Sequence, residues 1–257
     1  MKVVILAGGL GTRLAEETDI KPKPMVEIGG KPILWHIMKI YASYGFNDFI
    51  VCCGYKGHII KEYFQQFFLH HADITFDLAA NRMEVHHKTS ENCKVTLVDT
   101  GKDSMTGGRI HRIEPYVANE AFMLTYGDGV SNINITDLLR FHNAHGKLVT
   151  VTAVQHESRF GVLELNADNQ VKSFMEKPKG ESGWINGGFF VCEPGIFSYL
   201  NGDSTVWERE PLEQIASAGQ LCAFKHHGFW KPMDSLKDKN DLNAMWQNGT
   251  AEWKIWS

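Results

Sequence analysis

The sequence predicts an α/β protein with a Rossmann-like, mixed but mostly parallel sheet that carries helices on both faces. Three observations support this fold class. The chain opens with an apolar run at 3–6, whose unbroken hydrophobicity is typical of a buried parallel strand. Strand-like and helix-like segments then alternate. The 257 residues, 43% of them hydrophobic, are sufficient to bury a large core.

The first half of the chain contains four regular elements in this order. After the strand at 3–6, apolar residues at helical spacing predict a helix over 32–44. Pro32 suits the first turn of this helix, and Gly45 suits its C-terminal cap. DFIVCC at 48–53 is predicted as a strand and 56–68 as a helix. The polar segment 70–92 is compatible with an additional hairpin.

The second half is predicted to continue the same alternation. Further strands are expected at 94–99, 121–126, 148–156, 161–166, 171–175 and 187–192. Helices are expected near 107–114, 136–145, 210–218 and 235–246. Because no repeat, low-complexity tract or linker interrupts the pattern, we expect a single domain over 1–257 with two functional halves.

Charge and composition exclude several classes of partner. With 26 basic and 30 acidic residues, a net charge of -4 argues against nucleic-acid binding and against a polybasic membrane anchor. The first apolar run is too short for a signal peptide, and no run reaches the ~18 residues of a spanning helix. The five cysteines are odd in number and show no CxxC spacing. We therefore expect a soluble, cytoplasmic protein with reduced thiols.

The loop directly after the first strand, AGGLGTRL at 7–14, has the composition of an anion-binding turn. Its glycines allow positive φ angles and let phosphate oxygens approach backbone N–H groups, while Thr12 and Arg13 add a hydroxyl and a guanidinium. By itself the loop is equally compatible with a tight turn that binds nothing. A dinucleotide fingerprint would need Gly or Ala at Leu14, and a Walker A motif would need Ser or Thr at Pro32.

Several motifs together resemble the sugar-1-phosphate nucleotidyltransferases. The matching stretches are LAGGLGTRL (6–14), KPKPMVEIGGKPIL (21–34), LTYGDGV (124–130), MEKP (175–178), WINGGFFV (184–191) and KPMDSLKD (231–238). They cover most of the chain, and MTGGRIHRI (105–113) is most similar to the branch that uses CTP and α-D-glucose 1-phosphate. The resemblance implies a nucleotide-binding half over about 1–130, a sugar-binding half over about 131–234 and a helical tail over about 235–257.

The resemblance also implies how the nucleotide is held. The sugar phosphate would attack the α-phosphorus of CTP and release pyrophosphate without a covalent intermediate, so the protein must position two polyanions and neutralise charge. Arg13 and Lys23 are the implied catalytic residues, Arg13 at the leaving pyrophosphate and Lys23 at the α-phosphate. The implied nucleotide-binding residues are Leu6, Ala7, Gly8, Gly9, Leu10, Gly11, Thr12, Arg13, Lys23, Ser104, Thr106, Gly107, Arg109 and Asp128.

Two further groups of residues follow from the same resemblance. Asp128 and Asp234 are the implied ligands of Mg²⁺, an ion that prefers hard oxygen ligands. Taken alone, Asp234 would be interpreted as an N-cap, because a helical pattern follows it. The sugar phosphate would be bound by Glu176, Lys177, Asn186 and Gly187.

The stretch at 99–113, DTGKDSMTGGRIHRI, bears on the choice of base. It departs from the glutamine-rich stretch of the related thymidylyltransferases, which favours CTP over dTTP. Arg109 can only donate, so it suits O2 or N3 of cytosine, whereas the carbonyls of Leu6 and Ala7 would accept from its amino group. A salt bridge at a helix start is the alternative reading of Arg109. Three alternative functions remain open. They are the same reaction with dTTP or UTP, a non-catalytic nucleotide sensor, and a nicotinamide oxidoreductase.

The remaining aromatic and histidine-rich features are not interpreted as chemistry. The twelve histidines lack HxxxH spacing, which argues against a zinc site. Trp246, Trp253 and Trp256 in the tail are expected to pack on the body or on a second subunit rather than to stack on a base. A homo-oligomer is expected on that basis. The resemblance further implies a role in lipopolysaccharide O-antigen synthesis.

Overall fold

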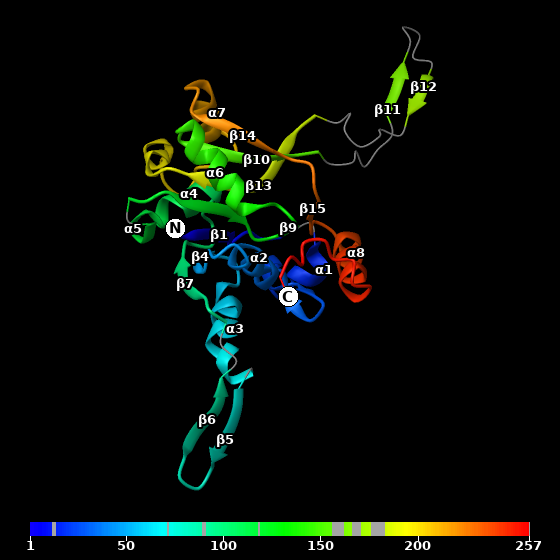
Figure 1. Ribbon diagram of the computed structural model, residues 1–257. Helices are drawn as coiled ribbons and strands as arrows, with labels where there is room; N and C mark the ends of the chain where they lie inside the picture. The colour runs from blue at the N-terminus through cyan, green and yellow to red at the C-terminus, as the bar shows by residue number, and fades with distance from the viewer. Residues whose placement is uncertain are drawn as a thin grey trace.

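A seven-stranded sheet forms the centre of the computed structural model (Figure 1). The structure describes residues 1–11, 14–70, 72–88, 91–117, 119–155, 162–165, 171–175 and 183–256. In spatial order the strands are β14 (Leu221–His226), β10 (Val149–Val154), β13 (Ile185–Cys192), β8 (Phe122–Tyr126), β1 (Val3–Ala7), β4 (Asp48–Cys53) and β7 (Lys94–Asp99).

Strand directions confirm the mixed, mostly parallel sheet. β8, β1, β4 and β7 are parallel neighbours, and β10 is parallel to β14. β13 is antiparallel to both β8 and β10, so it runs against all the other strands of the sheet. The predicted strand at the start of the chain thus becomes a central strand with partners on both sides, as its unbroken apolar run requires.

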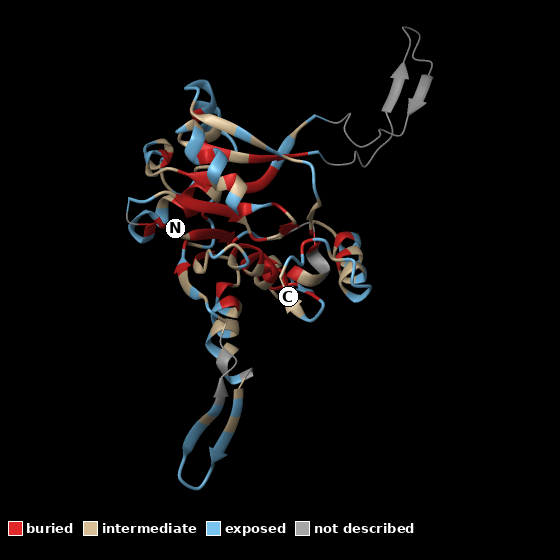
Figure 2. Cartoon of the chain, viewed as in Figure 1, coloured by how far each residue is buried: buried red, intermediate tan, exposed pale blue. Residues whose placement is uncertain are grey.

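Helices cover both faces of the sheet, as predicted. One face carries α2 (Ile33–Ala42), α3 (Gly57–His70) and α6 (Ile135–His145), and the other carries α4 (Thr106–Arg112), α5 (Glu114–Val117), α7 (Glu210–Ser217) and the 3-10 helix η3 (Pro194–Tyr199). Side chains of β1 alternate between the two layers: Ile5 belongs to the cluster under α2, whereas Val4 and Leu6 belong to the cluster under α4 and η3. Buried residues accordingly concentrate along the central strands and the adjoining helix faces (Figure 2).

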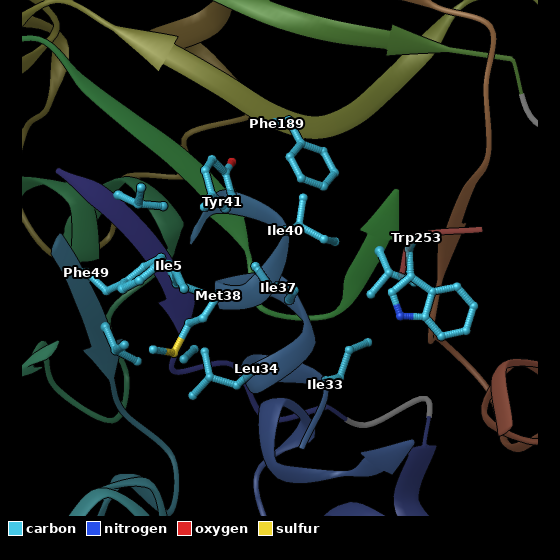
Figure 3. Close-up of a cluster of buried hydrophobic side chains, with 14 of the residues drawn as sticks. Ile5, Ile33, Leu34, Ile37, Met38, Ile40, Tyr41, Phe49, Phe189 and Trp253 are labelled. Atoms are coloured by element: carbon cyan, nitrogen blue, oxygen red, sulfur yellow. The ribbon is translucent and has the colours of Figure 1, made fainter. Parts of the chain in front are cut away.

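The larger cluster is built on the apolar stripe of α2. Ile33, Ile37 and Tyr41 of this helix belong to one buried cluster with Ile5 and Phe189 (Figure 3), and the rings of Tyr41 and Phe189 stack at 6.0 Å between centroids. These helix residues are fully buried, and burial of each large aliphatic side chain stabilises the fold by about 1.5–3 kcal/mol. The apolar residues whose spacing predicted the helix therefore form the face with which α2 packs in the core.

Short elements complete the chain. They are α1 (Ala15–Thr18), the 3-10 helix η2 (Lys23–Met25), α8 (Leu236–Gln247), and the antiparallel pairs β2 (Glu27–Ile28) with β3 (Lys31–Pro32), β5 (Ala72–Asp77) with β6 (Arg82–Lys88), β9 (Gly129–Ser131) with β15 (Trp230–Pro232), and β11 (Val162–Leu165) with β12 (Val171–Met175). The hairpin considered at 70–92 is present as β5–β6 and extends away from the sheet with Phe76 and Leu78 exposed (Figure 1). In the described ranges, no helix has the length and apolar character to cross a membrane.

The cysteines are all free, and Cys52, Cys53 and Cys192 are buried in the core. Burial raises the pKa of the Cys53 thiol to about 11. This thiol is therefore protonated at neutral pH and is a poor nucleophile, which agrees with the expectation of reduced, structural cysteines.

The tryptophan-rich tail packs on the body of the same chain. Trp253 is fully buried, and its indole N–H donates to Nδ1 of His36 at 3.3 Å. The rings of Trp246 and His36 meet edge to face at 4.7 Å between centroids. The ring of Trp246 also lies over Gly29, which has φ +59 and where a Cβ would come within 2.0 Å of the indole. This arrangement confirms the prediction that the tail packs rather than stacks on a base.

His36 makes the stability of this packing pH-dependent. Its Nε2 lies 2.8 Å from the carbonyl oxygen of Ile28 and its Nδ1 accepts from Trp253, so the ring is neutral with the proton on Nε2. Burial lowers the pKa of His36 from 6.5 to about 4. Between these values the unfolded chain binds a proton that the folded chain does not. The free energy of unfolding should therefore decrease by roughly 3 kcal/mol as the pH falls from 7 to 4.

Urea unfolding at several pH values measures this dependence. The His36→Gln variant should lose the part of the pH slope that belongs to His36, whereas His58→Gln, at an exposed position of α3, should retain the wild-type slope. Equal slopes in wild type and His36→Gln would contradict the assignment.

Candidate active site

One large cavity opens beside the ends of β1 and β8. It has a volume of about 710 Å³. The predicted nucleotide and metal residues that line it are Leu6, Ala7, Gly8, Gly9, Leu10, Gly11, Lys23, Ser104, Thr106, Arg109, Asp128 and Asp234. Side chains separated by more than 200 positions thus meet in one site at the carboxyl ends of parallel strands, where ligands bind in α/β folds.

Two glycines of the opening loop, Gly8 and Gly11, are required by close packing. Gly11 has φ +66, and a Cβ on it would lie 2.7 Å from the Thr18 methyl carbon. A Cβ on Gly8 would lie 2.1 Å from Nη1 of Arg109. The loop therefore brings its backbone against the cavity where a side chain would not fit. The predicted residues Thr12 and Arg13 lie outside the described residues.

Lys23 forms the centre of a three-residue ion cluster. Its Nζ lies 2.7 Å from Oδ2 of Asp128 and 2.7 Å from Oδ1 of Asp234. Burial opposes the charge on this side chain, but the two carboxylates outweigh that effect and raise the pKa of Lys23 above its usual value. Lys23 is therefore a fixed positive charge held at the cavity wall by two anions.

The backbone explains how two distant aspartates meet. β9 begins one residue after Asp128, β15 ends two residues before Asp234, and these strands pair with Gly129 opposite Pro232. The N–H of Met233 donates to the carbonyl of Asp128 at 2.8 Å, which extends the ladder to the two aspartates. The short β9–β15 pair, which the sequence pattern did not predict, is thus what assembles the site.

Asp234 does not cap the helix that follows it. The N-cap of α8 is Ser235, whose hydroxyl accepts from the N–H of Asp238, and the Asp238 carboxylate accepts from the N–H of Ser235 in a capping box. The interpretation of Asp234 as a helix cap is therefore wrong. Its Oδ1 is directed at Lys23 instead.

The two aspartates fit a divalent cation. They are carboxylates directed at one point of positive charge beside the cavity. Among the described residues no group of three or more His, Cys, Asp and Glu side chains gathers into a metal cluster, and Asp128 and Asp234 are two carboxylates that meet at the Lys23 ammonium. Mg²⁺ characteristically takes one or two carboxylates and completes its shell with phosphate oxygens and water.

Arg109 is buried, and its Nη atoms donate to protein oxygens. Nη1 donates to the Thr100 hydroxyl at 2.9 Å and to the Gly101 carbonyl at 2.7 Å. Nη2 donates to the carbonyls of Gly8 at 2.9 Å and Lys102 at 3.2 Å. Burial lowers the pKa of Arg109 from its usual value. Among the described residues these hydrogen bonds take the place of the salt bridge considered at a helix start, and contact of Arg109 with the base stays a prediction.

In this arrangement Arg109 holds the opening loop to the loop at 100–102. The Arg109→Lys variant should lose most of these hydrogen bonds, because one ammonium group cannot reach four acceptors. We expect a decrease of about 2–4 kcal/mol in the free energy of unfolding and a higher apparent KM for the nucleotide that the family resemblance implies. Urea unfolding and steady-state kinetics measure the two effects. An unchanged KM would remove Arg109 from any role at the site.

The other predicted nucleotide residues lie on or beside α4. Thr106 is the first residue of this helix, and its hydroxyl donates to Oε2 of Glu208 at 2.6 Å. Ser104 is buried in the cavity wall. Gly107 is not among the lining residues; it allows α4 to approach the chain at Thr205, because a Cβ there would lie 2.8 Å from the Thr205 carbonyl oxygen.

Two of the predicted sugar-binding residues, Asn186 and Gly187, are not among the lining residues of the cavity but hydrogen-bond side chains that line it. Asn186 on β13 donates to the Tyr126 hydroxyl at 3.2 Å and accepts from the N–H of Gly188 at 2.8 Å. The Gly187 carbonyl accepts from the indole N–H of Trp230 at 2.7 Å. Glu176 and Lys177 lie outside the described residues.

Tyr126, Trp230 and Glu208 are among the residues at the site that the sequence analysis missed. Tyr126 and Trp230 line the cavity, and Glu208 hydrogen-bonds two of its lining residues. Burial raises the pKa of the Tyr126 hydroxyl, and the neighbouring Glu208 carboxylate raises it further. Tyr126 stands two residues before Asp128 in the motif LTYGDGV, which was a usable signal; Glu208 stands in a polar stretch without periodicity.

Comparisons with known proteins agree with this geometry. A family described as "Nucleotidyl transferase" matches residues 2–231. Glucose-1-phosphate cytidylyltransferases of Salmonella typhimurium (strain LT2) and Salmonella typhi are each 60% identical to the chain over 257 residues, which is the full length of both proteins. Among solved structures, HddC from Yersinia pseudotuberculosis superposes with a TM-score of 0.70 at 25% identity and covers 95% of this chain and 99% of its own.

Proposed function

The chain belongs to the nucleotidyl transferase family, and from that premise we propose that it makes CDP-glucose and pyrophosphate from CTP and α-D-glucose 1-phosphate. In this reaction a phosphate oxygen of the sugar phosphate bonds to the α-phosphorus of CTP. The bond from the α-phosphorus to the oxygen bridging to the β-phosphate breaks, and pyrophosphate leaves with its electron pair. The observation that carries the proposal is 60% identity over the whole chain to enzymes named for this activity.

We assign the opening loop to the phosphates of CTP. Its backbone runs along the cavity from Gly8 to Gly11, where glycine leaves room for phosphate oxygens. Arg13, one of the proposed catalytic residues, would add a guanidinium to the leaving pyrophosphate. In this assignment the loop binds the part of CTP that departs.

We assign Lys23 to the α-phosphate. Its ammonium is held by Asp128 and Asp234 and has Pro22 and Pro24 on either side, so its position is restricted. A charge fixed before the reaction stabilises the transition state without reorganisation. Lys23 would also reduce the repulsion between the two bound polyanions.

We assign Asp128 and Asp234 to Mg²⁺, the cofactor that the family resemblance implies. When bound, the ion would neutralise charge on the phosphates. The two carboxylates would hold it beside Lys23, and the β9–β15 pair would fix their separation.

We assign the sugar to the side of the cavity near β13. Asn186 and Gly187 would face the glucose ring, with Glu176 and Lys177 binding a hydroxyl and the phosphate. The protein would act in the cytoplasm, as a homo-oligomer, and would supply CDP-glucose for O-antigen synthesis.

Nucleotide selectivity is the property that separates this proposal from the same chemistry on another base. We expect pyrophosphate release with CTP and glucose 1-phosphate to exceed that with UTP, dTTP, GTP or ATP. Each nucleotide is assayed with glucose 1-phosphate and mannose 1-phosphate at equal Mg²⁺. Comparable rates with UTP or dTTP would contradict the assignment of CTP, and CTP binding without turnover in any pair would indicate a sensor.

A further inference from the structure

The opening loop has three consecutive backbone donors beside the cavity. Gly9, Leu10 and Gly11 line the cavity, and within the described part of the chain their N–H groups donate to no protein acceptor. Successive unpaired N–H groups are suited to an anion. Their directions depend on the shape of the loop, so the contacts that hold this shape matter for a phosphate bound there.

The start of the loop is held through the carbonyl of Gly8. This oxygen accepts from the N–H of Tyr55 at 3.1 Å and from Nη2 of Arg109 at 2.9 Å. In a planar trans peptide the carbonyl and the following N–H point to opposite sides. The N–H of Gly9 therefore points away from Tyr55 and Arg109, and the direction of this donor is set by its neighbours.

The other end of the loop is held by Thr18, which is 3% exposed. Its hydroxyl shares one proton between the carbonyl oxygens of Gly11 at 3.1 Å and Leu14 at 3.0 Å. Its methyl carbon lies beside Gly11, 2.7 Å from where a Cβ would stand. Both branches of the Thr18 side chain thus contact the loop where it joins α1.

Lys56 in turn holds Thr18. Its Nζ donates to the Thr18 carbonyl at 3.3 Å and to the Asp19 carbonyl, and the Tyr55 hydroxyl also donates to the Thr18 carbonyl at 3.3 Å. The last carbonyls of a helix have no partners within it, so the ammonium satisfies the end of α1. Lys56 has φ +49, a conformation that favours glycine. A side chain is retained at this position despite the unfavourable backbone, which suggests that its ammonium is needed.

We propose that Thr18 and Lys56 are positioning residues that hold the opening loop in the shape that binds the departing pyrophosphate. Neither residue lines the cavity, so both act through the loop and not on the ligand. The inference rests on the proposed function, because it assumes that the loop binds the phosphates of CTP. It requires that CTP and pyrophosphate bind less tightly when the support is removed, whereas glucose 1-phosphate binds as before.

The Thr18→Val variant tests the hydroxyl, because valine keeps the branched shape and removes only the donor. The inhibition constant of pyrophosphate and the KM for CTP should each rise by about tenfold. The KM for glucose 1-phosphate should stay within about twofold of wild type. Thr18→Ser keeps the hydroxyl and should restore the pyrophosphate constant to within about threefold of wild type.

Two variants of Lys56 separate loop positioning from stability. Lys56→Met removes the ammonium and should weaken pyrophosphate binding in the same direction. Lys56→Gly removes the ammonium and also the unfavourable φ, so urea unfolding should show a smaller loss of stability than in Lys56→Met. The loss of pyrophosphate binding should nevertheless be the same in both. Combining Thr18→Val with Lys56→Met should add little to either single loss, since both act on the same end of the loop.

Thr136→Val and Lys61→Met are the matched controls, because both residues are exposed on helices and do not line the cavity. Both should retain the wild-type constants. Unchanged pyrophosphate and CTP constants in folded Thr18→Val and Lys56→Met, or equal increases for CTP and glucose 1-phosphate, would overturn the inference and leave the proposed function intact. A wild type that forms no CDP-glucose would overturn both. If Thr18→Val does not fold, as judged by circular dichroism, the Lys56→Gly measurement decides the outcome.

Discussion

Replacing Lys23 with methionine should reduce kcat for pyrophosphate release by about 100- to 1,000-fold, the usual loss for one group that stabilises transition-state charge. Methionine keeps an unbranched stem and removes only the ammonium. The KM for glucose 1-phosphate should change less than kcat, because the interaction is strongest where charge moves to the leaving group.

Lys21→Met is the matched control for this experiment. Lys21 lies two residues away in the same motif and pairs with Glu27 at 3.0 Å, outside the cavity. Its replacement should leave kcat within about twofold of wild type, as expected for a surface ion pair. Equal losses in the two variants would show that the motif acts through its fold and not through the Lys23 charge.

Asp128→Asn and Asp234→Asn should each lower kcat by about 1,000-fold, which corresponds to roughly 4 kcal/mol of charge stabilisation. Each variant should also raise the Mg²⁺ concentration at half-maximal rate by at least about tenfold, because one of two carboxylate ligands is lost. Initial rates over a range of Mg²⁺ concentrations measure both quantities.

Asp137→Asn provides the comparison for the aspartate variants. Asp137 is half-buried on α6 and pairs with Arg140, and it is not among the lining residues of the cavity. The variant should have the Mg²⁺ dependence of wild type. If Asp234→Asn behaved like Asp137→Asn, the second metal ligand would have to be assigned elsewhere.

The central elements α2 and β1 were predictable from the sequence because burial imposes a pattern on it, whereas the edge strand β14 and the 3-10 helix η3 were not predicted. The apolar stripe of α2 and the unbroken apolar run of β1 can both be recognised in the sequence, and both elements lie at the centre of the fold. Strands β9 and β15 have three residues each, too few to show an alternation. Their pairing was therefore missed, although it brings Asp128 and Asp234 together.

The candidate site was predictable where a residue type implies one chemistry. Lys23 and the two aspartates lie together as the family motifs imply. Arg109 was harder to interpret because its acceptors include backbone carbonyls of separate loops, at Gly8 and at Gly101. Backbone acceptors have no signature in the sequence. Glu208 was missed for a similar reason, since its two partners come from α4 and β8.

The most direct test of the central claim is to incubate the purified protein with CTP, α-D-glucose 1-phosphate and Mg²⁺ and to measure both products by chromatography and a pyrophosphate assay. We predict CDP-glucose and pyrophosphate in equal amounts, with no product when glucose 1-phosphate is omitted. Pyrophosphate release that does not need the sugar phosphate, or the absence of CDP-glucose from a folded protein that binds CTP, would contradict the account.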